Sequence, residues 1–172
     1  MFQKGDYIIY GNTGICLVED ICTPTDIPTA SKDKLYYRLT PVHSKGTIYI
    51  PVDTSVFMRP AITRSQALKL IAQIPHIPTD SFKSQDQRLL AEHYKATIHT
   101  HKCENLIQLI KTAYLKNKSL TERGKRPCQT DLQYMKKAEY LLHGEIAGAL
   151  DIPLAQVPDY ICNSVKESQT VS

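Results

Sequence analysis

The spacing of apolar positions changes once along the chain, near residue 61. Before that point, short apolar and β-branched runs alternate with polar turn residues, as is typical of β-strands. Strands this short and this closely spaced favour a small five-stranded barrel of the Tudor or SH3 type. The predicted strands cover residues 7–10, 15–23, 35–39, 47–52 and 56–58.

Beyond residue 62 the apolar positions recur at intervals of three and four, which is the period of an amphipathic helix. Helix starts are expected where a small polar residue can cap the first turn. Thr63 with Gln66 fits a capping box, Ser84 is a candidate cap, and Thr130 with Gln133 fits a second capping box. The third helix is predicted over residues 102–117, before a basic loop at 118–127, and a last short helix within 153–165.

The two patterns together predict an α+β chain with two domains. A five-stranded β-barrel is expected over residues 1–60, and an all-α bundle of four or five helices over residues 61–172. The boundary is placed near Pro60 because the period and the capping signals change there.

Charge is distributed unevenly, although the net charge is only +4. Residues 1–60 carry six basic and six acidic side chains, whereas residues 83–137 carry twelve basic against five acidic ones. A localised basic region indicates a polyanionic partner, with an ordinary solvated helix surface as the alternative.

Motifs of the common catalytic sites are missing from the sequence, so no enzyme activity and no catalytic residue is predicted. His99, His101 and Cys103 are the one candidate metal cluster. Alternate residues share a side only on an extended chain, so a polar loop between helices is favoured, and no metal or cofactor is expected. The five scattered cysteines are expected as free thiols, and the chain shows no signal peptide or membrane span, which favours the cytoplasm.

Several stretches resemble one family of transcription regulators. Residues 5–10 followed by Gly14 and Ile15, together with residues 35–37 and 48–52, resemble the N-terminal module of CarD/CdnL proteins, which also occurs in the transcription-repair coupling factor. In the second half, residues 94–96 and 137–145 resemble the same family. The resemblance covers about residues 1–162.

This resemblance implies that the N-terminal domain is Tudor-like and binds the β subunit of bacterial RNA polymerase. Strand addition would provide the contact, in which an exposed strand edge pairs with a strand of the partner. Tyr49 would set specificity, unless it is only a surface aromatic of the barrel, and Pro51 would limit the ladder. The implied docking strand is Thr47, Ile48, Tyr49, Ile50, Pro51 and Val52.

The resemblance further implies that the helical domain contacts promoter DNA near the upstream edge of the melted bubble, without reading its sequence. Leu90 stands where many members have a wedging Trp, and it is either a wedge or a core residue. Glu92 and His93 stand where flanking arginines are found in the family. The predicted DNA-contacting residues are Leu90, Lys95, Arg123, Lys125, Arg126, Lys136 and Lys137.

The predicted function is therefore a monomeric, nucleoid-associated transcription regulator that modulates the stability of the open complex. Two alternatives remain at this stage. The chain could bind polymerase as an adaptor without touching DNA, or the basic domain could bind RNA, since phosphate contacts alone do not separate the two nucleic acids. A small enzyme with an unrecognised site would rest only on the cluster from His99 to Cys103.

Overall fold

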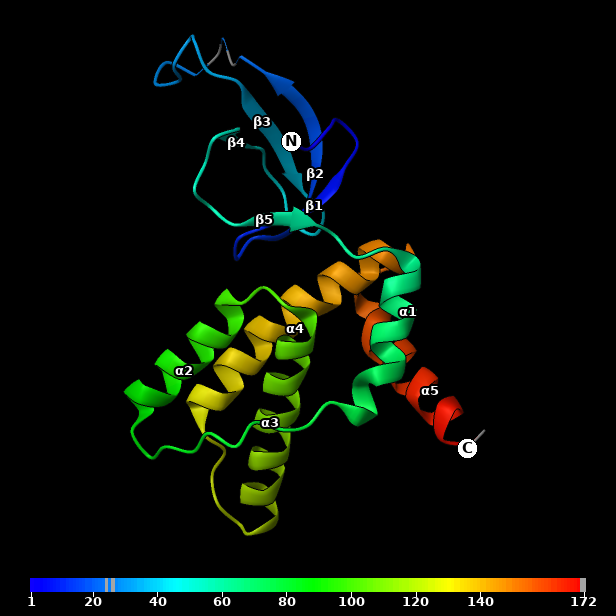
Figure 1. The fold of residues 1–172 in the computed structure, drawn as a ribbon. Helices are drawn as coiled ribbons and strands as arrows, with labels where there is room; N and C mark the ends of the chain where they lie inside the picture. Colours follow the sequence, from blue (N-terminus) through cyan, green and yellow to red (C-terminus); the bar gives the residue numbers. More distant parts are fainter. Residues whose placement is uncertain (24, 26, 171–172) are drawn as a thin grey trace. The chain divides into compact units, whose positions relative to one another are not determined.

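The computed structural model of the chain describes residues 1–23, 25 and 27–170 (Figure 1). The chain divides into two compact units, Met1–Ile62 and Thr63–Ser172. The last two residues of the predicted helical domain, 171 and 172, lie outside the described residues.

The N-terminal unit is built on one antiparallel sheet with the strand order β4-β3-β2-β1-β5. An α+β chain is confirmed, but the sheet is open, with β4 and β5 as its two edges, and closure into a barrel is not confirmed. The last strand begins at Met58 instead of residue 56, because the Phe57 carbonyl accepts a bond from Gly11 N–H (2.9 Å) in the turn after β1. The strands are β1 (Tyr7–Tyr10), β2 (Gly14–Cys22), β3 (Tyr36–Pro41), β4 (Ile48–Pro51) and β5 (Met58–Pro60).

One face of the sheet carries the core of this unit. Side chains alternate between the two faces of a strand, and β3 shows this clearly, with Tyr37 and Leu39 buried and Tyr36 and Arg38 half-buried. A bulge between Val18 and Asp20 shifts the pairing of β2 with β3. The buried cluster consists of Ile8, Cys16, Val18, Tyr37, Leu39 and Ile50.

The C-terminal unit is a bundle of five α-helices arranged around α4, which packs against each of the other four. Figure 1 shows α2 and α3 beside the first half of α4, and α1 and α5 beside its second half. Within the described residues, no helix is long and apolar enough to cross a membrane. The helices are α1 (Arg64–Gln73), α2 (Gln87–His99), α3 (Cys103–Glu122), α4 (Gln129–Leu150) and α5 (Val157–Thr170), with 3-10 turns η1 (Ile74–His76) and η2 (Leu154–Gln156).

The first predicted cap is confirmed and the other two are wrong. Thr63 Oγ1 accepts from Gln66 N–H (3.2 Å) while Gln66 Oε1 accepts from Thr63 N–H (2.9 Å), which completes the capping box of α1. The carboxylate of Asp86 caps α2 in place of Ser84, because its Oδ1 reaches Arg88 N–H at 2.9 Å. The predicted cap Thr130 lies inside α4, which begins after Cys128 and has no side-chain cap.

The third helix is longer than predicted. Residues 118–122, predicted as part of a basic loop, form the last turn of α3. Gly124 ends the helix, because with φ +70° it lets Lys125 N–H bond the Leu120 carbonyl (2.9 Å) and its own N–H bond the Thr121 carbonyl (3.0 Å). This is a Schellman motif, and it places the helix end five residues beyond the predicted one.

Candidate functional site

The edge strand β4 is the first candidate site. It pairs only with β3 in the sheet, in the register Arg38–Tyr49 and Tyr37–Ile50. Val52 N–H donates to the Leu35 carbonyl (3.0 Å), so this is a hydrogen-bonded pair of the ladder. Bonded and non-bonded pairs alternate in an antiparallel ladder, which makes Ile50 a bonded partner and turns the N–H and C=O of Tyr49 away from the sheet.

The ladder that β4 can offer to a partner is short. Pro51 also faces outward by the same alternation, but it has no N–H, and its carbonyl accepts a bond from Thr54 N–H (3.0 Å) in the following turn. Thr47 and Val52, the outer residues of the predicted docking strand, lie just outside β4. A strand added at this edge would therefore pair mainly with Tyr49.

The side chain of Tyr49 lies beside charged neighbours. Tyr49 is 38% exposed, and its cross-strand partner Arg38 projects on the same face. The Arg38 Nε lies 3.3 Å from Glu19 Oε2 without hydrogen-bond geometry. A partner strand added to β4 would thus meet an aromatic ring next to a partly neutralised guanidinium.

The basic residues predicted to contact DNA lie on three elements of the helical unit. Arg123, Lys125 and Arg126 are exposed in the connection between α3 and α4. The other lysines are exposed on α2 (Lys95) and on α4 (Lys136 and Lys137). Lys137 Nζ lies 4.9 Å from the ring centre of Tyr134, which is a cation–π contact. This contact keeps the ammonium group of Lys137 close to α4.

Leu90 is not on this surface. It is 1% exposed in the bundle core, whereas the preceding residue, Leu89, is 45% exposed on the first turn of α2. The packing therefore agrees with the core alternative for Leu90. The exposed apolar residue at this helix start is Leu89, which the apolar stripe of the sequence did not single out.

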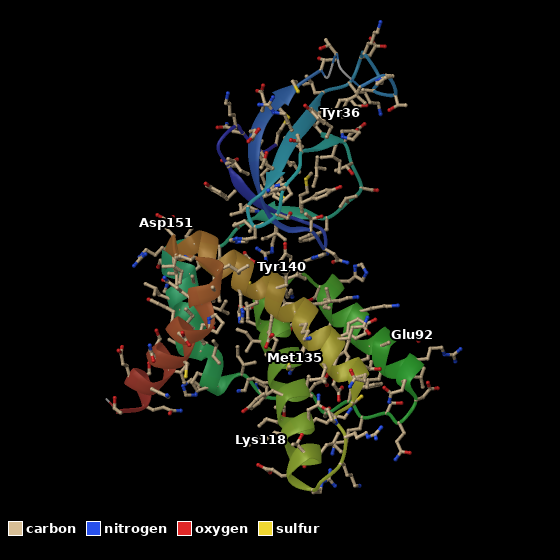
Figure 2. All side chains as sticks on the ribbon, turned by 180° about the vertical axis from the view of Figure 1, so that it is seen from behind. Tyr36, Glu92, Lys118, Met135, Tyr140 and Asp151 are labelled. Carbon is tan, nitrogen blue, oxygen red and sulfur yellow. The ribbon has the colours of Figure 1, made fainter. Side chains whose placement is uncertain are left out.

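Glu92 and His93, on the same helix, have different surroundings. Glu92 is exposed (labelled in Figure 2), whereas His93 Nε2 pairs with Asp80 Oδ2 and its ring stacks on Phe82 at 4.0 Å. Burial raises the pKa of Asp80, but hydrogen bonds from Phe82 N–H and from His93 outweigh that effect and lower it overall. These contacts fasten the segment before α2 onto the helix.

A buried polar network joins α2, α3 and α4. Asp131 is completely buried, its Oδ1 accepts from Tyr94 Oη (2.6 Å), and its Oδ2 lies 3.1 Å from Lys116 Nζ. Burial, together with the hydrogen bond to Asp131 and the charge of that carboxylate, raises the pKa of Tyr94, so the phenol remains a neutral donor. The sequence pattern did not indicate this network. Asp131 lies in the first turn of α4, where acidic residues are common and usually exposed.

The cluster from His99 to Cys103 lies at the turn between α2 and α3. His99 is exposed, His101 is buried with φ +54°, and Cys103 Sγ donates to Glu145 Oε2 at 3.4 Å. Among the residues that the structure describes, no group of three or more His, Cys, Asp and Glu side chains could hold a metal ion.

An exposed edge strand can pair with a strand of another protein, which is one way in which protein-docking modules bind. Residues 2–62 match the family model of the CarD-like/TRCF RID domain, and the predicted family resemblance is confirmed for this part of the chain. This match supports an RNA polymerase-interacting module in the first unit. A search of curated proteins gave no match.

Proposed function

We propose that the protein is a transcription regulator that docks on the β subunit of RNA polymerase through β4 and contacts promoter DNA through its basic helical unit. The family match supports the polymerase partner, and the free edge of β4 supports docking by strand addition. The exposed basic side chains from Arg123 to Lys137 support a DNA contact that does not read sequence.

The proposed mechanism has two parts, which are tethering to polymerase and a preference of the helical unit for opened promoter DNA. Docking on polymerase raises the effective concentration of the helical unit at the promoter, so that a weak DNA contact is sufficient. If the helical unit binds the opened promoter better than the closed one, it favours the open complex by that difference in affinity. The protein acts as a monomer at the bacterial nucleoid, and no catalytic step is required.

The single observation that carries this proposal is the outward-facing main chain of Tyr49 on β4. Tyr49→Pro removes the outward N–H but no bond between β3 and β4, so the sheet should stay folded. Tyr49→Thr is the matched control, because it removes the aromatic ring and keeps both main-chain groups. Binding of each full-length variant to purified β subunit is measured by titration, with thermal unfolding as the folding check.

Tyr49→Pro should bind the β subunit about tenfold more weakly than wild type, because one main-chain bond is lost and the partner's carbonyl is left unpaired. Tyr49→Thr should bind more tightly than the proline variant. Equal losses in the two variants would mean that the ring, and not the strand edge, makes the contact. Unchanged binding of Tyr49→Pro would rule out docking through this edge.

The DNA contact is tested by reversing charge on α4. The double variant Lys136→Glu and Lys137→Glu should weaken binding to forked promoter DNA and lower the slope of log K against log salt by about 1 per lost contact. Lys69→Glu with Lys166→Glu is the matched control, since these exposed lysines lie on α1 and α5. Equal behaviour of the two double variants would favour an adaptor that binds polymerase without DNA, and stronger binding to structured RNA would favour the RNA alternative.

A further inference from the structure

A groove lies between α3 and α4, and neither the proposed docking of β4 on polymerase nor the proposed DNA contact of the basic residues accounts for it. Its volume is about 400 Å³ and its walls are mostly apolar. Figure 2 labels Lys118 and Met135, which lie on opposite walls, one on each helix. The residues that line it include Tyr114, Asn117, Lys118, Pro127, Leu132 and Met135.

The groove contains a buried donor that lacks a partner. Asn117 is 7% exposed, and its Oδ1 accepts from Cys128 N–H at 2.8 Å, which fixes the orientation of the amide. Within the described part of the chain, its Nδ2 has no hydrogen-bond partner. Buried donors are nearly always paired, so an unpaired one beside a groove indicates a ligand that brings an acceptor.

The lining residues that the structure describes include one basic and one acidic side chain, and further basic residues are close to them in the chain. Lys118 is part of the lining, and the exposed Arg126 and Lys136 adjoin the lining residues Pro127 and Met135 in the chain. Glu122 is the carboxylate of the lining and offsets part of this charge. An exposed aromatic, an apolar wall and a nearby lysine are features by which proteins hold single-stranded nucleic acid.

We propose that this groove binds one unpaired nucleotide, which rests on the proposed DNA contact and extends it to the melted strand. The base stacks on Tyr114, which is 56% exposed, and packs against Leu132 and Met135, while Lys118 faces the phosphate. A base carbonyl accepts from Asn117 Nδ2. Because Nδ2 is buried, side chains of the lining must shift to admit the base oxygen, while the ring of Tyr114 stays in place as the stacking surface.

The amide donor predicts a base preference. Thymine, cytosine and guanine carry a carbonyl oxygen that could accept from Nδ2, whereas adenine carries none. Full-length protein should therefore bind a short oligothymidine more tightly than an oligoadenine of the same length. Binding is measured by fluorescence anisotropy at fixed salt, because phosphate contacts change with ionic strength.

Tyr114→Ala should weaken oligothymidine binding about 5- to 150-fold, the range expected for one stacked base. Leu115→Ala is the matched control, since Leu115 is the next residue on α3, is 49% exposed and does not line the groove. Equal affinities of these two variants would overturn the proposal. If forked DNA still loses affinity with the double lysine variant on α4, the proposed DNA contact stands although the nucleotide site fails.

Asn117→Asp supplies an independent readout. The variant keeps the acceptor for Cys128 N–H and loses the donor, so the preference for thymine over adenine should disappear while the helical unit stays folded. A retained preference would overturn the assignment of Asn117. Thymidine monophosphate binding as tightly as the oligonucleotide would identify a free nucleotide and overturn the strand contact, and a Tyr114→Ala variant impaired only in polymerase binding would identify a protein-docking groove instead.

Discussion

The hydrogen bond between Tyr94 and Asp131 provides a sharp test of how the helical unit is held together. Tyr94→Phe removes one hydroxyl and leaves the ring packed against Tyr134 at 5.7 Å. Asp131 then keeps Lys116, whose Nζ donates to Oδ1 at 3.3 Å, but loses the shorter 2.6 Å bond from Tyr94. Since the carboxylate is completely buried, water has no direct access to replace the lost donor.

A hydrogen bond to an ionised group contributes about 1.5–3 kcal/mol. For a unit the size of Thr63–Ser172, 1 kcal/mol corresponds to about 4 °C in melting temperature. Tyr94→Phe should thus melt about 6–12 °C below wild type, followed by circular dichroism at the helix band. Tyr140→Phe is the control, because Tyr140 is 44% exposed and the free energy of unfolding should change by less than about 0.5 kcal/mol.

A double-mutant cycle with Asp131→Ala isolates the pair, because alanine removes the acceptor of the Tyr94 hydroxyl. The free energies of unfolding of the two single variants should not add, because residues that share one hydrogen bond couple by about 0.5–3 kcal/mol. If Tyr94→Phe had the same melting temperature as Tyr140→Phe, the hydrogen bond to Asp131 would not stabilise the helical unit. Strictly additive effects in the cycle would lead to the same conclusion.

Three further outcomes follow from the structure. Gly124→Ala should destabilise the helical unit by about 1–2 kcal/mol in chemical denaturation, since Gly124 has φ +70°. Gly148→Ala, inside α4, is the control, and an equal loss of stability in both variants would contradict this prediction. The pKa of Asp80 is lowered from 3.8, so its contribution to stability is present above that pH and is lost as the pH falls through the folded-state value. The urea midpoints of wild type and Asp80→Asn should therefore differ at pH 6, and the difference should shrink as the pH falls below 3.8, whereas a constant difference would contradict the linkage. Burial raises the pKa of the Cys16 thiol to about 11, so Cys16 should resist alkylation at pH 8 that modifies the exposed Cys162, as read by mass spectrometry.

Local structure was largely predictable because it depends on residues close together in the chain. The capping box of Thr63 and Gln66 needs only side chains three residues apart, and it was predicted correctly. The match of residues 2–62 to the RID family also followed from short strand motifs in the sequence. The end of α3 was missed, because residues 118–122 are polar and only the Schellman motif at Gly124 shows where the helix stops.

The candidate sites depended on contacts between distant residues, and only the tertiary structure decided them. Hydrophobic alternation predicts that residues 47–52 form a strand. Only the order of the strands in the sheet shows that β4 lies at an edge, with the main chain of Tyr49 facing outward. Helical periodicity cannot separate Leu89 from Leu90, since burial depends on where α4 packs. Local pattern in the amino-acid sequence was enough to predict most of the helices and strands and the family of residues 2–62. The free edge, the buried Asp131 and the unpaired amide of Asn117 arise from long-range packing.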